Sequence, residues 1–104
     1  NNMIIAFDFD KTLSDVRLQR LAKKLIAERN EVWVVTMRRD DDFNNKFMKP
    51  TLDKLPLSKY RVIFCDNKPK FEMIQMINAD IYIDNISDEF EDIKNHTNTI
   101  PLLW

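Results

Sequence analysis

The chain has 104 residues, with 16 Lys and Arg against 17 Asp and Glu, and a formal net charge of −1. This length suits a single domain over residues 1–104, and the balanced charge gives no strong field that would favour nucleic acid or a membrane surface. Without a signal peptide or a membrane-spanning apolar run, and with one cysteine, the chain is expected in a reducing cytoplasm. Glycine is absent, which excludes glycine-rich phosphate loops and the dinucleotide fingerprint.

The first predicted element is a buried strand over residues 3–8, apolar on both faces and followed by Asp8-Phe-Asp10-Lys-Thr12. Two carboxylates this close to a buried strand are costly unless a cation compensates them. A helix should follow, capped by Ser14 or Asp15. Its apolar side chains recur at helical spacing, at Leu18, Leu21, Ala22, Leu25 and Ile26.

A second strand is predicted over residues 31–36, ending at Thr36. The acidic run at 40–42 could then cap a short helix whose apolar positions are Phe43, Phe47 and Met48. Pro50 and Pro56 are expected to break up the rest of this connection. We expect the connection to be the least regular part of the chain and to carry any feature specific to the substrate.

The second half of the chain repeats the alternation of strand and helix. A third strand is predicted over residues 60–65, before Asp66, and a helix after it, with Asn67 as N-cap and Pro69 in its first turn. A fourth strand is predicted over residues 80–84 and a last helix from near Ser87. Residues 98–102 could add a fifth strand at the edge of the sheet.

This alternation predicts an α/β fold, a Rossmann-like three-layer sandwich with a mostly parallel sheet and helices on both faces. Right-handed crossovers would bring the carboxyl ends of all strands to one edge. Asp8, Thr36, Asp66 and Asp84 stand at those ends. Open α/β sheets bind their ligands at this edge, so we expect the side chains to form one site.

The residue types at this edge suit phosphoryl transfer. Carboxylates such as Asp8 and Asp84 are ligands that Mg²⁺ prefers, together with water and substrate phosphate. A carboxylate held near the metal can attack phosphorus, and Asp10 could protonate the leaving oxygen. Thr36 offers a hydroxyl to the phosphoryl oxygens, and Lys68 offers charge beside a helix N-terminus.

These residues resemble the four motifs of the haloacid dehalogenase superfamily, whose members are mostly magnesium-dependent phosphatases. Asp8-Phe-Asp10-Lys-Thr12 resembles the DxDxT signature, and Thr36 after an apolar strand is similar to the second motif. Asn67-Lys68-Pro69 is similar to the third, a lysine, and Asp84 with Asp88 to the fourth, an acidic pair. The motifs follow the order of the family and cover nearly the whole chain.

The resemblance implies a role for each matching residue. Asp8 would be the nucleophile and Asp10 the general acid and base. Thr36 and Lys68 would bind the phosphoryl group, with Lys70 as a competitor for the lysine role; Lys68 is favoured because it directly precedes Pro69. Mg²⁺ would be held by side chains and one main-chain carbonyl, from Asp8, Asp10 (carbonyl), Asp84 and, directly or through water, Asp88.

The chain departs from the family pattern around this core. Lys11 stands where many members have glycine, and the segment after Ser14 is too short for the usual flap hairpin. No stretch between the motifs is long enough for a cap domain, which predicts an open site. Such a site admits a bulky phosphorylated substrate, for example a nucleotide, a nucleic-acid end or a phosphoprotein.

Two other functions compete with a phosphatase. A signalling receiver domain is also a doubly wound sheet, and Asp66 could mimic its phosphate-accepting aspartate. A binding or regulatory module could keep the fold without turnover. The positions of Thr36 after the second strand and Asp84 after the fourth favour the phosphatase over the receiver.

Overall fold

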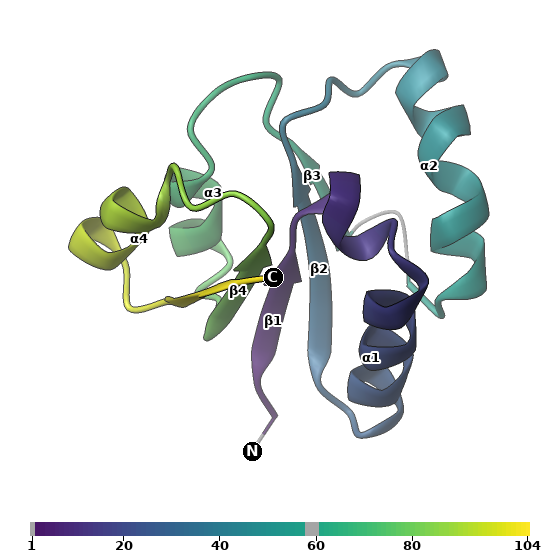
Figure 1. Cartoon of the computed structure of the whole chain (residues 1–104), viewed down its shortest axis with the longest axis horizontal. Coiled ribbons are helices and arrows are strands. Elements are labelled where there is room, and N and C mark those ends of the chain that lie inside the picture. Colours follow the sequence, from purple (N-terminus) through teal and green to yellow (C-terminus); the bar gives the residue numbers. More distant parts are fainter. Residues whose placement is uncertain (1, 58–60) are drawn as a thin grey trace.

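The structure is a computed structural model of the chain and describes residues 2–57 and 61–104. Its centre is one sheet in the order β3-β2-β1-β4-β5, in which every recorded strand pair is parallel. The fold is therefore α/β as predicted (Figure 1). The strands are β1 (Ile4–Phe7), β2 (Glu31–Thr36), β3 (Val62–Phe64), β4 (Ile81–Asp84) and β5 (Ile100–Leu103).

Helices cover both faces of the sheet, which gives the three layers of a Rossmann-like sandwich (Figure 1). On one face α1 (Val16–Ala27) and α2 (Asp42–Lys54) enclose a buried cluster that includes Phe7, Leu18 and Met48. On the other, α3 (Phe71–Met76) and α4 (Phe90–His96) enclose a second cluster that includes Tyr82 and Ile93. Burial on both faces explains why β1 is apolar throughout.

The connection after β2 is more regular than predicted. Helix α2 runs for 13 residues with Pro50 inside it, so the expectation that this proline breaks the helix was wrong. Proline inside a helix removes a hydrogen bond and costs about 3 kcal/mol. Buried Met48 and Leu55 pack α2 against the sheet on either side of the proline, and this packing opposes that cost.

The helix after β3 begins later than predicted. Asp66 and Asn67 both have a left-handed backbone, with φ of 50° and 62°, and α3 begins only at Phe71. Asn67 therefore belongs to a turn and is not the N-cap, which is Lys70. The last helix also begins three residues after Ser87, at Phe90. Tyr60, the first residue of the predicted third strand, lies outside the described residues.

The sheet order identifies where a ligand would bind. The chain passes from β3, at one edge, across to β4, which pairs with β1 on the side away from β2. The strand order thus reverses between β1 and β4, and ligands of open α/β sheets bind beside the carboxyl ends at such a switch point. In the described part of the chain, no helix is long and apolar enough to cross a membrane.

Candidate functional site

A pocket of about 610 Å³ opens at the carboxyl ends of β1 and β4. Asp8 directly follows β1 and Asp84 ends β4, and the Asp8 N–H donates to the Ile83 carbonyl at 2.9 Å. This bond holds the two strand ends together. The pocket is lined by several predicted site residues, namely Asp8, Asp10, Asp84 and Asp88.

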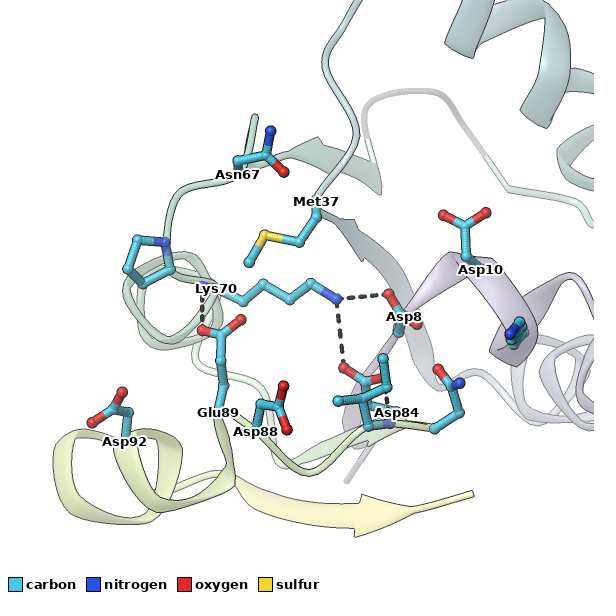
Figure 2. Close-up of a pocket in the computed structure, with 13 residues that line it drawn as sticks. Asp8, Asp10, Met37, Asn67, Lys70, Asp84, Asp88, Glu89 and Asp92 are labelled. Carbon is cyan, nitrogen blue, oxygen red and sulfur yellow. Dashed lines mark hydrogen bonds and ion pairs between the residues drawn. The ribbon is translucent and has the colours of Figure 1, made fainter.

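A lysine lies between the two strand-end carboxylates (Figure 2). Lys70 Nζ is 2.6 Å from Asp8 Oδ1 and 3.5 Å from Asp84 Oδ2. It also donates to the Tyr82 hydroxyl at 2.8 Å, and that hydroxyl donates to Asp84 Oδ2 at 2.5 Å. All four side chains are buried, so the ammonium supplies the compensating charge that the paired carboxylates require.

The local structure explains why these four side chains meet. Tyr82 and Asp84 stand two residues apart on β4 and therefore point to the same face of the sheet. Lys70 reaches that face from the turn that enters α3, where its backbone N–H donates to Glu89 Oε1 at 2.6 Å. Glu89, just before α4, thus holds the backbone of Lys70 in place, as Figure 2 shows.

We call Lys70, Asp8, Tyr82 and Asp84 the inner network, and burial alters the protonation of its members. Desolvation raises the pKa of Asp8 to about 6, and it outweighs the opposing effect of Lys70, while Asp84 raises that pKa further. Burial, followed by the charge of Asp84, raises the pKa of the Tyr82 phenol far above its ordinary value. Tyr82 therefore keeps its proton and acts as a hydrogen-bond donor to Asp84.

Four oxygens surround the side-chain nitrogen of Asn85 beside this network. In the amide orientation that satisfies its neighbours, Asn85 donates to Asp84 Oδ1 and the Asp10 carbonyl, each at 3.2 Å. Asp8 Oδ2 and Thr12 Oγ1 lie within hydrogen-bond distance of the same nitrogen, each at 3.3 Å, and its two hydrogens are shared among the four oxygens. We call these four acceptors the oxygen cluster. Each carboxylate therefore turns one oxygen toward Lys70 and the other toward the oxygen cluster.

The residue types of the oxygen cluster suit a magnesium ion, which would take the place that the Asn85 amide holds at its centre. Within residues 2–57 and 61–104, no group of three or more His, Cys, Asp or Glu side chains is arranged to hold a metal. Magnesium, however, usually takes only one or two protein carboxylates and keeps several waters. Asp8, Asp84 and the Asp10 carbonyl would provide two carboxylates and one main-chain oxygen. Asp88 lines the same pocket with an exposed side chain.

The Asp10 side chain points away from the inner network, as Figure 2 shows. Both of its oxygens accept hydrogen bonds from Arg38, Oδ1 from Nη2 at 2.8 Å and Oδ2 from Nε at 3.0 Å. Arg38 also donates to Asn44 Oδ1 at 2.6 Å, which links the pair to α2. Hydrogen bonding to Asp10 raises the pKa of Arg38. The predicted acid and base is therefore held at the outer rim of the pocket.

The structure does not bring the two predicted phosphate-binding residues into the pocket. Thr36 is buried, and its hydroxyl accepts a hydrogen bond from the Arg38 amide at 3.2 Å. Lys68 is exposed in the turn before α3. The preference for Lys68 over Lys70 is corrected by the contact of Lys70 with Asp8. Because Asp66 and Asn67 extend the turn, Lys70 instead of Lys68 occupies the start of the helix.

Sequence reasoning missed two members of the site. Tyr82 carries a signal in the alternation of a strand, because a residue two places before Asp84 must lie beneath it on the same face. Asn85 directly follows Asp84 and could have been noticed by position alone. The role of Arg38 as the partner of Asp10 has no such signal, since the two are 28 residues apart.

The sheet order argues against the receiver interpretation. Receiver domains have the order 2-1-3-4-5, in which the third strand lies beside the first. Here β2 separates β3 from β1, and Asp66 is exposed at the far side, 3.8 Å from Arg39. Asp66 therefore has a place different from that of a receiver's phosphate-accepting aspartate.

The chain matches no protein-family model, and neither the curated proteins nor the solved structures contain a significant match to it. Membership of the haloacid dehalogenase superfamily therefore stays a prediction based on the four motifs.

Proposed function

We propose that the chain is a magnesium-dependent phosphohydrolase that forms an aspartyl-phosphate on Asp8. The observation that carries this proposal is that Asp8 Oδ2, Asp84 Oδ1 and the Asp10 carbonyl surround one point, which the side-chain nitrogen of Asn85 occupies and from which it would move to admit the ion. The lysine on the other side of the two carboxylates supports it. A bound Mg²⁺ would supply positive charge that stabilises the phosphoryl oxygens in the transition state.

In the first step Asp8 Oδ1 attacks the phosphorus of a phosphomonoester. An Asp8 oxygen–phosphorus bond forms, and the bond from phosphorus to the ester oxygen breaks. Asp10 takes up a proton from solvent once it has left Arg38, and it gives this proton to the leaving oxygen, which departs as an alcohol. Lys70 stands beside Asp8 Oδ1 and donates to a phosphoryl oxygen as charge develops there.

In the second step water hydrolyses the aspartyl-phosphate. Asp10, now a carboxylate, takes a proton from the water, whose oxygen attacks phosphorus. The bond from phosphorus to Asp8 breaks, which restores the carboxylate and releases inorganic phosphate. Asp10 must turn inward for both steps, because Arg38 holds its side chain at the rim.

The experiment that tests this proposal is the release of phosphate from p-nitrophenyl phosphate with Mg²⁺ and with EDTA. Asp8→Asn should lose the activity, because an amide is no nucleophile for phosphorus. Asp66→Asn is the matched control, since Asp66 also follows a strand but lies beyond β2; it should keep the activity. Activity that survives in Asp8→Asn would overturn the mechanism.

Labelling with a radioactive phosphomonoester separates the competing functions. Acid-stable label on Asp8, absent from Asp8→Asn, supports the aspartyl-phosphate. Label on Asp66 would support a receiver. If wild-type protein binds Mg²⁺ but releases no phosphate from a panel of nucleotide, sugar and peptide phosphomonoesters, the chain is a binding module.

A further inference from the structure

Tyr82 is a fully buried residue that reaches the site from inside the protein. Its ring belongs to the cluster beneath α3 and α4, together with Ile74 and Ile93. A phenol hydroxyl buried this deeply needs hydrogen-bond partners, and Tyr82 has them in Lys70 and Asp84. The proposed reaction assigns no step to this residue.

The two hydrogen bonds of Tyr82 have a fixed direction. An ammonium group can only donate, and an ionised carboxylate can only accept. Lys70 Nζ therefore donates to the phenol oxygen at 2.8 Å, and the phenol O–H donates to Asp84 Oδ2 at 2.5 Å. The hydroxyl thus bridges the Lys70 ammonium and the Asp84 carboxylate, which also form a direct but longer ion pair of 3.5 Å.

The distances in the site agree with a separating role. Lys70 Nζ makes a direct contact of 2.6 Å with Asp8 but stays 3.5 Å from Asp84 Oδ2. Asp84 Oδ2 accepts from the Tyr82 hydroxyl, and Oδ1, which accepts from the Ile86 N–H at 3.1 Å, faces the other three members of the oxygen cluster. Without the hydroxyl, the ammonium would move toward Asp84 to replace the lost partner.

We propose that Tyr82 is a positioning residue. It holds the Lys70 ammonium beside Asp8 and keeps Asp84 Oδ1 turned toward the place where Mg²⁺ would bind. The role in metal binding rests on the proposed function. The placing of Lys70 does not, and it can be tested without metal or substrate. Partners that orient a metal ligand typically change metal affinity by 10–100-fold when they are removed.

The test compares Tyr82→Phe with a matched removal of another buried hydroxyl. Phenylalanine keeps the ring in the core and removes only the oxygen. Thr99 is also buried, and its hydroxyl donates to the Ala79 carbonyl at 2.6 Å, near the opposite end of β4. Thr99→Val therefore reports the cost of losing a buried hydroxyl outside the site.

Isothermal titration with MgCl₂ gives the first measurement, with Tm measured for each protein. We expect Tyr82→Phe to bind Mg²⁺ about 10–100-fold more weakly than wild type, and Thr99→Val to bind within twofold. For p-nitrophenyl phosphate, KM should rise in Tyr82→Phe at saturating Mg²⁺, because Lys70 moves away from Asp8. A Mg²⁺ affinity within twofold of wild type, with Tm lowered as in Thr99→Val, would overturn the proposal.

The second measurement is the ¹⁵N signal of the Lys70 ammonium in metal-free protein. We expect a resolved signal with slow hydrogen exchange in wild type and in Thr99→Val, and faster exchange with a changed shift in Tyr82→Phe. An unchanged signal in Tyr82→Phe overturns the inference. If this variant does not fold, wild type alone decides, because rapid exchange at Lys70 contradicts an ammonium held by Tyr82. Failure of wild type to bind Mg²⁺ would overturn the proposed function, while the Lys70 signal still tests the placing.

Discussion

The site contains two pairs of an aspartate and a cation that differ in their burial. In the inner pair, Lys70 and Asp8 lie 2.6 Å apart with side chains 4% and 11% exposed. In the outer pair, Arg38 and Asp10 lie 2.8 Å apart with side chains 23% and 49% exposed. The contact distances are similar, so the surroundings of each pair determine how strongly it is held.

This difference in burial predicts which of the two pairs can open during the reaction. Breaking a buried ion pair leaves an unsatisfied charge and costs several kcal/mol, whereas an exposed pair contributes about 0–1 kcal/mol. The inner pair should therefore stay in place until Asp8 attacks phosphorus, when the Lys70 ammonium passes from Asp8 Oδ1 to a phosphoryl oxygen. The outer pair can open at little cost and release Asp10 toward the substrate, as the proposed reaction requires.

Lys70→Met should have the largest effect. The variant leaves Asp8 and Asp84 buried without their cation, which should lower the free energy of unfolding by about 3–5 kcal/mol. Urea denaturation measures this loss, and Lys68→Met is the matched control because Lys68 is exposed two residues earlier. The control should change stability by less than about 0.5 kcal/mol. Similar losses in both variants would remove the distinction between the two lysines.

The contribution of Asp8 to the stability of the protein should depend on pH. Burial raises the pKa of Asp8 from 3.8 to about 6 in the folded protein, so the folded state binds a proton more readily than the unfolded state. In EDTA, the stability of wild type relative to Asp8→Asn should therefore increase as pH falls from about 6 toward 3.8, and be constant above that window. Urea titrations at several pH values measure the difference. A relative stability that decreases on acidification would contradict a raised pKa.

The fold could be predicted because its signals are local. Alternating apolar strands and capped helices gave the sheet, and β2 was predicted with its observed bounds, Glu31–Thr36. Pro50 was misjudged because packing of α2 on the sheet outweighs the local preference against proline. The start of α3 was misjudged because nothing local revealed the left-handed turn at Asp66 and Asn67.

The site could be predicted in part, through the strand ends. Asp8 and Asp84 meet because parallel strands end at one edge, a rule that needs only the order of elements. The order of elements could not predict which lysine reaches Asp8, because two extra turn residues place Lys70 there instead of Lys68. The pairing of Asp10 with Arg38 depends on how two loops face each other across β1 and β2.

The outer pair should be much less sensitive to substitution. Arg38→Met removes both hydrogen bonds to Asp10, yet should lower the free energy of unfolding by no more than about 1 kcal/mol, since Asp10 then turns to water. Arg39→Met serves as control, because Arg39 is exposed and its ion pairs are 3.8 and 4.0 Å long. Urea denaturation at low and high salt measures the stability of both variants. A loss near that of Lys70→Met would show that the outer pair is equally fixed.

Lys11→Gly should have the smallest effect and concerns the turn that carries Asp10. Lys11 has φ of 58°, a left-handed conformation that is unfavourable for a lysine and easy for glycine. Relief of this strain exceeds the added freedom of the unfolded chain, so stability should rise by up to about 1 kcal/mol. Asn78→Gly is the control at φ of 54°, and its gain should be smaller because asparagine tolerates this conformation. Thermal denaturation measures both variants. If Lys11→Gly is less stable than wild type, contacts of the lysine side chain must stabilise the outer rim. The rim would then be less free to move than its exposure indicates.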